Sequence, residues 1–239
     1  MKCIDIHSHI LPYMDDGAKN ARVSLEMLRL AEKEGITDII VTPHYRRGRY
    51  KGDRKQMDQV LAEMRELIKE EGIHINLYPG NEIYYNSELE DKLESGSLSG
   101  MNDTDHVLVE FSLMEDFMNI RSAVDDLFSM GYTPIIAHVE RIQCIAKKIE
   151  YARYLKKCGC ELQVNASSAA GELGFICKFF VHKMLREKLV DYIATDAHDI
   201  VKRQPVISRC AKVLYRKYNR EYVDEILFKN AEERLIASK

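Results

Sequence analysis

Short apolar runs alternate along the chain with longer segments in which apolar residues recur at helical spacing. The short runs are rich in β-branched residues and are bounded by turn residues, a pattern typical of buried strands. They cover residues 3–6, 37–42, 73–78, 106–111, 133–137, 161–165 and 190–195. The segments with helical spacing cover residues 18–34, 54–71, 119–130, 144–157, 169–188 and, as two or three helices, 205–238. This alternation predicts an α/β fold of seven strand-helix units with a parallel sheet.

Side chains that can bind metal ions stand just after most of the predicted strands. The first strand leads directly to His7 and His9, and imidazole is the commonest nitrogen ligand of metals. A His-x-His pair alone is more often two histidines on one strand face, so the other strand ends decide the interpretation. They carry Asp15, Asp16, His44, Glu82, Glu110, His138, Asp196 and His198. A barrel gathers the carboxyl ends of all its strands on one face, so we expect a TIM-like barrel with a polynuclear metal site there.

Composition and charge limit what this site can serve. The 239 residues, 46% hydrophobic and 31% charged, suit one sizeable domain, which we expect to span 1–239. A net charge of −3 does not favour nucleic acid as a partner. No apolar run is long enough to span a bilayer and no leader pattern precedes the first strand, so we expect a cytoplasmic protein without membrane insertion. The six cysteines form no CxxC pair, and we expect reduced thiols.

Residues 45–54 are the most basic stretch of the chain and directly follow His44. Arg46, Arg47 and Arg49 stand there between two tyrosines. Two interpretations stay open: a solvated loop, or a loop at the rim of the site whose arginines and tyrosines guide an anionic substrate.

The candidate ligands belong to seven short motifs that occur in order between residues 3 and 205. The motifs are Ile4-Asp5-Ile6-His7-Ser8-His9, Asp15-Asp16-Gly17, Thr42-Pro43-His44-Tyr45, Gly80-Asn81-Glu82, Val109-Glu110, Ala137-His138-Val139-Glu140-Arg141 and Asp196-Ala197-His198. Together they resemble the PHP (polymerase and histidinol phosphatase) superfamily. Within it, Asp-Asp-Gly and Gly-Asn-Glu are similar to the manganese-dependent tyrosine-protein phosphatases of bacterial capsule and exopolysaccharide operons.

The resemblance implies a distorted (β/α)7 barrel with three metal ions on its C-terminal face, Mn²⁺ in this family. The implied ligands are His7, His9, Glu82 and Asp196 for one ion, Glu82, Glu110 and His138 for a second, and Asp16, His44 and His198 for the third. Glu82 would bridge the first two ions.

Arg141 and Arg203 are the implied phosphate-binding residues. Two departures from the family pattern lie beside them. Val139 replaces the usual proline, which affects the local backbone shape more than metal binding, and Lys202-Arg203-Gln204-Pro205 replaces Gly-Arg-Pro.

The residue types favour the same chemistry independently of the resemblance. Carboxylate oxygens mixed with imidazoles suit Mn, Fe or Zn better than Mg or Ca, and the lack of cysteine among the candidates argues against a structural zinc site. Two or three such ions would neutralise a phosphate monoester and produce a hydroxide for in-line attack on phosphorus. By resemblance, the substrate is a phosphotyrosine protein, the tail of a bacterial tyrosine kinase of polysaccharide export.

Other functions fit parts of the sequence. Cys210 and Arg216 match the Cys-x5-Arg spacing of thiol phosphatases, but the residues between them lack glycine and predict a helix, so we interpret the match as coincidence. A phosphatase for histidinol phosphate or another small molecule differs mainly in substrate. A PHP-type nuclease and a metal-free regulatory module are the remaining alternatives.

Overall fold

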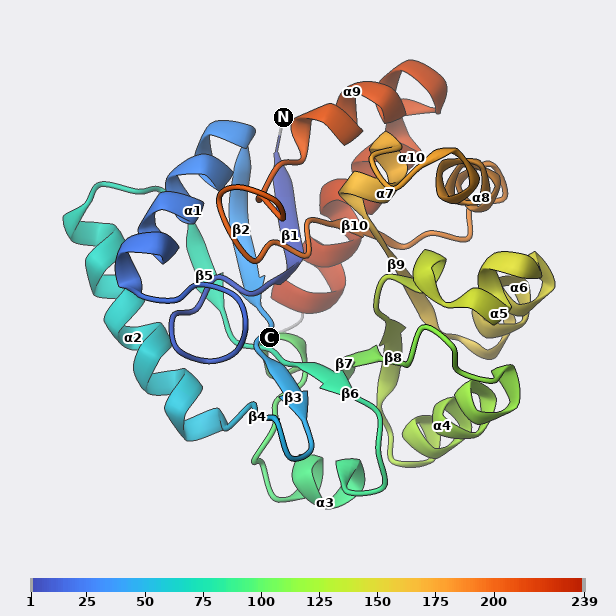
Figure 1. The fold of residues 1–239 in the computed structure, drawn as a ribbon, viewed down its shortest axis with the longest axis horizontal. Helices are drawn as coiled ribbons and strands as arrows, with labels where there is room; N and C mark the ends of the chain where they lie inside the picture. The colour runs from blue at the N-terminus through green and yellow to red at the C-terminus, as the bar shows by residue number, and fades with distance from the viewer. Residues whose placement is uncertain (1, 238–239) are drawn as a thin grey trace.

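The computed structural model describes residues 2–237 and shows a ring of strands surrounded by helices (Figure 1). Within these residues, one sheet has the order β1-β2-β5 and a larger sheet has the order β10-β9-β8-β7-β6-β3-β4. Neighbouring strands are parallel in every pair except the hairpin β3–β4 of the described chain. The strands are β1 (Cys3–Ser8), β2 (Ile36–Val41), β3 (His44–Arg46), β4 (Tyr50–Lys51), β5 (Asn76–Tyr78), β6 (Glu82–Tyr84), β7 (His106–Glu110), β8 (Thr133–Ile136), β9 (Glu161–Asn165) and β10 (Tyr192–Ala194).

The two sheets join into one distorted barrel. The chain leaves β2, passes Pro43 and continues as β3, and β5 continues in the same way as β6 after a short break. The ring closes where β1 meets β10, because His9 N donates to Ala197 O and Asp196 N donates to His7 O, both at 2.8 Å. The predicted TIM-like barrel of seven strand-helix units is therefore confirmed. Two of its strands are interrupted, one between β2 and β3 and the other between β5 and β6.

Helices cover the outside of the ring (Figure 1). They are α1 (Ala21–Glu34), α2 (Arg54–Glu70), α3 (Leu89–Glu94), α4 (Phe117–Ser129), α5 (Gln143–Lys147), α6 (Ile149–Cys158), α7 (Ala166–Ala170), α8 (Phe175–Arg186), α9 (Ser208–Lys217) and α10 (Arg220–Asp224). The chain also forms two 3-10 turns, η1 (Met101–Asp103) and η2 (Val139–Arg141), and two π-helical segments, η3 (Glu225–Lys229) and η4 (Glu232–Ile236). Asn20 caps α1 by accepting from Val23 N at 3.0 Å, and Gly35 ends it in the left-handed conformation. Over residues 2–237 no helix has the length and apolar character needed to cross a bilayer.

Residues 144–157 and 45–54 are among the segments that differ from the prediction. The helix predicted over 144–157 is two helices, because Lys148 has an extended backbone (φ −141°) that ends α5 before α6 begins. The basic stretch 45–54 contains the hairpin β3–β4, whose turn uses Gly48 at φ +73°. Its strands are too short and too charged to show the apolar alternation by which strands are predicted.

Apolar side chains pack in two layers, one inside the ring and one between the ring and the helices. The inner layer includes Ile4 and Ile135 from the strands, together with Leu235 from η4. Lys2, which precedes β1, lies over the ring of Phe228 in η3 at 5.5 Å. The C-terminal segment therefore closes the end of the barrel where β1 begins, and leaves the end near His7 for polar side chains.

Asp5 strengthens the closure of the barrel between β1 and β10. Its carboxylate is fully buried and accepts hydrogen bonds from Thr195 N at 2.9 Å and from Thr195 Oγ1 at 2.5 Å. Burial raises the pKa of Asp5 to about 6, although the bonds from Thr195 act in the opposite direction.

We expect Asp5→Ala to lower the free energy of unfolding by about 3 kcal/mol, because two buried donors of Thr195 lose their acceptor. Asp5→Asn keeps one carbonyl acceptor and should cost less. Denaturant unfolding of the three proteins measures both effects. Equal stability of wild type and Asp5→Ala would contradict the role given to this contact.

Candidate metal centre

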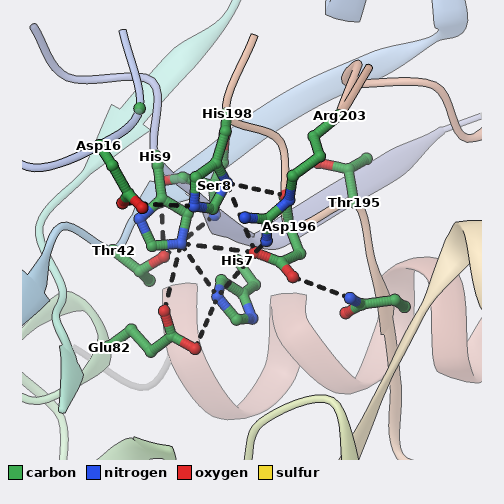
Figure 2. A network of polar contacts seen from close by, with 12 residues as sticks. His7, Ser8, His9, Asp16, Thr42, Glu82, Thr195, Asp196, His198 and Arg203 are labelled. Carbon is green, nitrogen blue, oxygen red and sulfur yellow. Dashed lines mark hydrogen bonds and ion pairs between the residues drawn. The ribbon is translucent and has the colours of Figure 1, made fainter. Parts of the chain in front are cut away.

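The nine predicted metal ligands converge at the carboxyl ends of the strands. His7 lies one residue before the end of β1, His9 directly follows this strand, and Asp196 and His198 follow β10 (Figure 2). Glu82 begins β6, His44 begins β3, Glu110 ends β7, His138 follows β8, and Asp16 lies in the loop between β1 and α1. His7, His9, Glu82, His138, Asp196 and His198 are buried, His44 and Glu110 are partly buried, and Asp16 is the most exposed of the nine. The structure therefore brings together all of the side chains that the sequence placed in one site.

Glu82 lies at the centre of this group. Its Oε1 is 3.2 Å from His7 Nε2 and 3.0 Å from His138 Nε2. Its Oε2 is 3.2 Å from His9 Nε2 and 2.8 Å from His44 Nδ1. One buried carboxylate thus touches four imidazoles.

Asp196 forms the second anionic point of the site. Its Oδ1 is 3.5 Å from Nε2 of both His7 and His9, and Arg203 Nη2 lies 2.6 Å from the same oxygen. Its Oδ2 accepts from Asn165 Nδ2 at 2.8 Å. Asp196 (φ +54°) and His138 (φ +32°) both have positive φ, which residues other than glycine adopt rarely and mostly at functional sites.

Groups behind the histidines determine which ring nitrogen faces the site. Gln163 Oε1 already accepts from His138 N at 2.7 Å and lies 3.1 Å from His7 Nδ1, so Nδ1 carries the proton and Nε2 presents a lone pair. Asp15 Oδ2, 2.7 Å from His9 Nδ1, orients His9 in the same way. His198 Nδ1 donates to the carbonyl of Asp196 at 3.1 Å. These acceptors prepare three imidazoles for metal binding.

The sequence analysis did not predict that Gln163 orients His7. It also assigned no separate role to Asp15, which orients His9. Gln163 stands between two other polar residues that alternate along β9, and all of these side chains are buried. Polar residues that alternate along a strand buried on both faces are unusual, and this pattern could have indicated a functional role for Gln163. Asp15 also accepts from Gly17 N, and a Cβ on Gly17 would lie 2.0 Å from His9 O, so the Asp-Asp-Gly motif needs its glycine.

Buried nitrogen and oxygen atoms that form no directed hydrogen bond indicate whether the site suits metal ions. Among the described residues, several buried donor and acceptor atoms of this site form no well-directed hydrogen bond, although groups of opposite charge lie beside some of them. These atoms are His44 Nδ1, Glu82 Oε2, Glu110 Oε2, Asp196 Oδ1 and His198 Nε2. Three groups have donor atoms within 4.8 Å of one another: His7, His9 and Glu82; His44, Glu82 and Glu110; His9, His44 and His198. The donors fit divalent cations.

These groups agree only partly with the grouping implied by resemblance. The first contains three of the four ligands implied for one ion. The second has His44 in place of His138, and the third has His9 in place of Asp16.

The charges of the site depress or raise several pKa values. Burial would raise the pKa of Glu82, but His7 and His44 outweigh it and hold the pKa well below its usual range. Burial would lower the pKa of His9, but Asp15 raises it well above its usual value. Burial would also lower the pKa of His7, but Glu82 and Asp196 raise it above its usual value. Buried carboxylates and imidazoles therefore stabilise each other's charged forms in the metal-free chain.

The two predicted phosphate-binding arginines reach the same site. Arg141 Nη1 lies 3.7 Å from Asp196 Oδ2, on the side of the carboxylate opposite to Arg203. The turn η2 that carries Arg141 is anchored by Glu140, whose Oε1 accepts from Ser168 Oγ at 2.6 Å. Val139 is fully buried in this turn, so the turn forms with valine at the position of the usual proline.

The alternative thiol mechanism finds no support in the structure. Cys210 is buried in the helix α9, and burial raises the pKa of its thiol to about 12. A reactive thiolate needs an exposed, electropositive setting. The Cys-x5-Arg spacing is therefore a coincidence of helical sequence.

The barrel and its cluster of imidazoles and carboxylates define a metal-dependent hydrolase. Comparison with known proteins agrees. Residues 3–236 match the family described as "Capsular polysaccharide synthesis, CpsB/CapC", and the chain belongs to this family. The PHP resemblance is thus confirmed at the level of its tyrosine-phosphatase branch.

Individual relatives cover nearly the whole chain. This chain is 34% identical over 229 residues to "Tyrosine-protein phosphatase YwqE" of Bacillus subtilis (strain 168). The alignment covers 96% of this chain and 90% of the relative. A solved structure described as "Crystal structures of YwqE from Bacillus subtilis and CpsB from Streptococcus pneumoniae, unique metal-dependent tyrosine phosphatases" superposes with a TM-score of 0.92 at 31% identity, covering 99% and 95%. An amidohydrolase from Mycoplasma synoviae, 13% identical with a TM-score of 0.65 and coverage of 98% and 87%, shares the fold.

The raised pKa values of His7 and His9 predict a pH dependence for protein stripped of metal. Because folding raises both values, the protonated histidines contribute full stability below about pH 6.5, the unfolded value, and this contribution is lost as the pH rises through the folded values. We therefore expect the Tm of chelated protein to fall above about pH 6.5. The increase in Tm caused by a divalent ion should grow over the same interval, because the ion displaces protons.

Thermal melts with a chelator or with added divalent ion, at several pH values, measure both trends. Glu82→Gln removes the buried anion and should flatten the first trend. A Tm of chelated wild type that rises steadily with pH would contradict the assignment.

Proposed function

We propose that this chain removes the phosphate group from phosphotyrosine in a protein substrate. The chain is a metal-dependent tyrosine phosphatase by family, since its relatives carry this activity in their names. The observation that carries the proposal is the convergence of imidazoles and carboxylates on Glu82, within reach of Arg141 and Arg203. Residues 1–239 would form a single phosphatase domain, because strand ends from β1 to β10 contribute to this one site.

The proposed metal ligands are those expected from the sequence. They are His7, His9, Glu82 and Asp196 for one ion, Glu82, Glu110 and His138 for a second, and Asp16, His44 and His198 for a third. We propose Mn²⁺, with iron and zinc as the other ions that mixed imidazole and carboxylate donors suit. When bound, such ions supply positive charge for a phosphate monoester and make water more acidic and nucleophilic.

The chain's own cations would hold the phosphate. Arg141 and Arg203 are partly exposed at the mouth of the site, and Asp196 contacts one nitrogen of each. A guanidinium group has five N–H donors in a planar fork, so the remaining donors can face phosphate oxygens. Asp196 and the anchored turn η2 would thus orient both arginines before the substrate arrives.

The surroundings of the site support a protein substrate over a small molecule. Within residues 2–237, the large apolar side chains that are exposed lie before or within the first turns of α1, α4, α8 and α9, in segments that follow the carboxyl ends of β1, β7, β9 and β10. They are Tyr13, Leu113, Met114, Met118, Leu173, Phe175, Ile176, Phe179 and Val201. Exposed apolar side chains gathered on one face are typical of protein-binding surfaces. Histidinol phosphate would not need such a rim.

The proposed partner is a bacterial tyrosine kinase that acts in polysaccharide synthesis or export and carries its phosphotyrosines on a flexible tail. Membership of a capsular polysaccharide synthesis family supports this choice. The six cysteines are all unpaired, which supports action in the reducing cytoplasm.

Replacing Glu82 should cost more than replacing Glu110. Glu82 contacts four imidazoles within 3.2 Å, whereas the Glu110 oxygens lie 3.8 Å from His44 and His138. We expect Glu82→Ala to lower kcat/KM by more than about 100-fold and to reduce the bound metal, with a smaller loss of both for Glu110→Ala. Enzyme assays and elemental analysis measure these effects. Equal, mild losses with full metal content would refute the bridging role.

Side-by-side turnover tests the substrate. With Mn²⁺ in excess, we expect a phosphotyrosine peptide to be hydrolysed with a higher kcat/KM than histidinol phosphate, and single-stranded DNA to remain intact. Chelation should abolish the activity and Mn²⁺ should restore it. Preference for histidinol phosphate would instead establish a small-molecule phosphatase, and cleavage of DNA a nuclease.

A further inference from the structure

The hairpin β3–β4 covers one side of the metal centre. Arg46, Arg49 and Tyr50 line the same cavity, of about 160 Å³, as Glu82, Arg141 and Arg203. Pockets that enclose whole drug-sized ligands measure roughly 300–1,000 Å³. This cavity therefore suits the end of a side chain, while the polypeptide that carries it stays outside.

Asn81 holds the hairpin in place. It is fully buried, and its Nδ2 donates to Pro43 O at 3.2 Å and to Gly52 O at 3.1 Å, one on each side of the hairpin. Its Oδ1 accepts from Ser99 N at 3.1 Å. A Cβ on Gly52, which has φ +55°, would lie 2.9 Å from Tyr45 Cβ. The base of the hairpin is thus fixed by buried polar contacts and close packing, and its side chains keep their place beside the site.

The three arginines of the hairpin have different surroundings. Arg46 lies over the ring of Tyr84 at 4.4 Å, and Arg49 lies over the ring of Tyr50 at 4.9 Å. Both line the cavity. Arg47 points elsewhere: it is 65% exposed and its Nε lies 3.0 Å from Glu88. The structure therefore separates two cations of the site from one of the outer surface.

Tyr50 is the apolar wall of this cavity. Its ring lies nearly parallel to the imidazole of His44, at an angle of 14° and with centroids 5.6 Å apart. Among the described residues that line the cavity, Tyr50 alone carries a phenol ring, and the others are charged residues or histidines. Apart from the imidazoles, an aryl ring attached to a phosphate at the metal centre has no other aromatic or aliphatic side chain of the cavity to pack against.

We propose that the hairpin selects aryl phosphates: Tyr50 packs against the ring of the substrate, and Arg46 and Arg49 add positive charge for the phosphate group. Aromatic pairs gain a modest free energy beyond burial of area, which is enough to distinguish an aryl from an alkyl ester. This inference rests on the proposed phosphatase function and assigns its preference for phosphotyrosine to Tyr50. It also separates Arg47 from the substrate-guiding role suggested for the whole basic stretch.

Two inhibitors that differ only by the ring test the proposal. Phenylphosphonate and methylphosphonate carry the same anionic group, and their inhibition constants are measured against turnover of p-nitrophenyl phosphate with Mn²⁺ in excess. We expect wild type to favour phenylphosphonate, and Tyr50→Ala to reduce this preference about threefold to tenfold. Tyr50→Phe keeps the ring and should restore the preference. The constants do not depend on the fraction of enzyme that carries metal.

The arginines provide matched variants of equal charge. Arg49→Ala should weaken both inhibitors by a similar factor of about ten, because it removes a cation and no ring. Arg47→Ala removes the same charge from the same hairpin outside the cavity, and both constants should stay within twofold of wild type.

An unchanged ratio of the two constants in Tyr50→Ala would overturn aryl selection by the hairpin while leaving the phosphatase function intact. A wild type that hydrolyses neither p-nitrophenyl phosphate nor a phosphotyrosine peptide would refute the proposed function itself.

Discussion

The burial of two carboxylates among imidazoles is the constraint on which the rest of this structure depends. Glu82 and Asp196 are almost completely buried, and a buried charge is costly unless cations and hydrogen bonds compensate it. Protonated histidines can do so in the metal-free chain, and metal ions held by the proposed ligands would do so in place of the protons. Folding, proton uptake and metal binding would then be coupled through one set of contacts.

The barrel supplies this cluster with a rigid frame. The proposed ligands come from strands around the ring, so their mutual distances depend on the closure between β1 and β10, where Asp5 and backbone hydrogen bonds join the two strands. Behind the ligands, Gln163 and Asp15 hold the imidazoles in the orientation that leaves a lone pair toward the centre. Rigid support of this kind lets a site of many donors form without large rearrangement.

The outer part of the active face has a different composition from its centre. Charged and imidazole groups occupy the cavity, and the hairpin β3–β4 contributes one phenol ring and two arginines to its wall. Exposed apolar side chains lie in loops and first helical turns that follow β1, β7, β9 and β10. This arrangement separates two tasks. In the proposed function, the buried centre would bind the phosphate group, whereas the wall and the rim would contact the parts of a substrate that distinguish one ester from another.

The sequence by itself determined seven of the strands, β1, β2, β5, β7, β8, β9 and β10, most helices and the set of side chains that meet in the site, because these depend on local periodicity and on residues that follow strand ends. Tertiary structure decided which groups support them. Gln163 stands 156 residues from His7, and nothing local indicates that they meet. The direction of Arg47 away from Arg46 and Arg49, and the burial of Cys210, likewise follow from the packing of a closed barrel. Contacts between distant segments, unlike periodicity, leave no pattern in a single sequence.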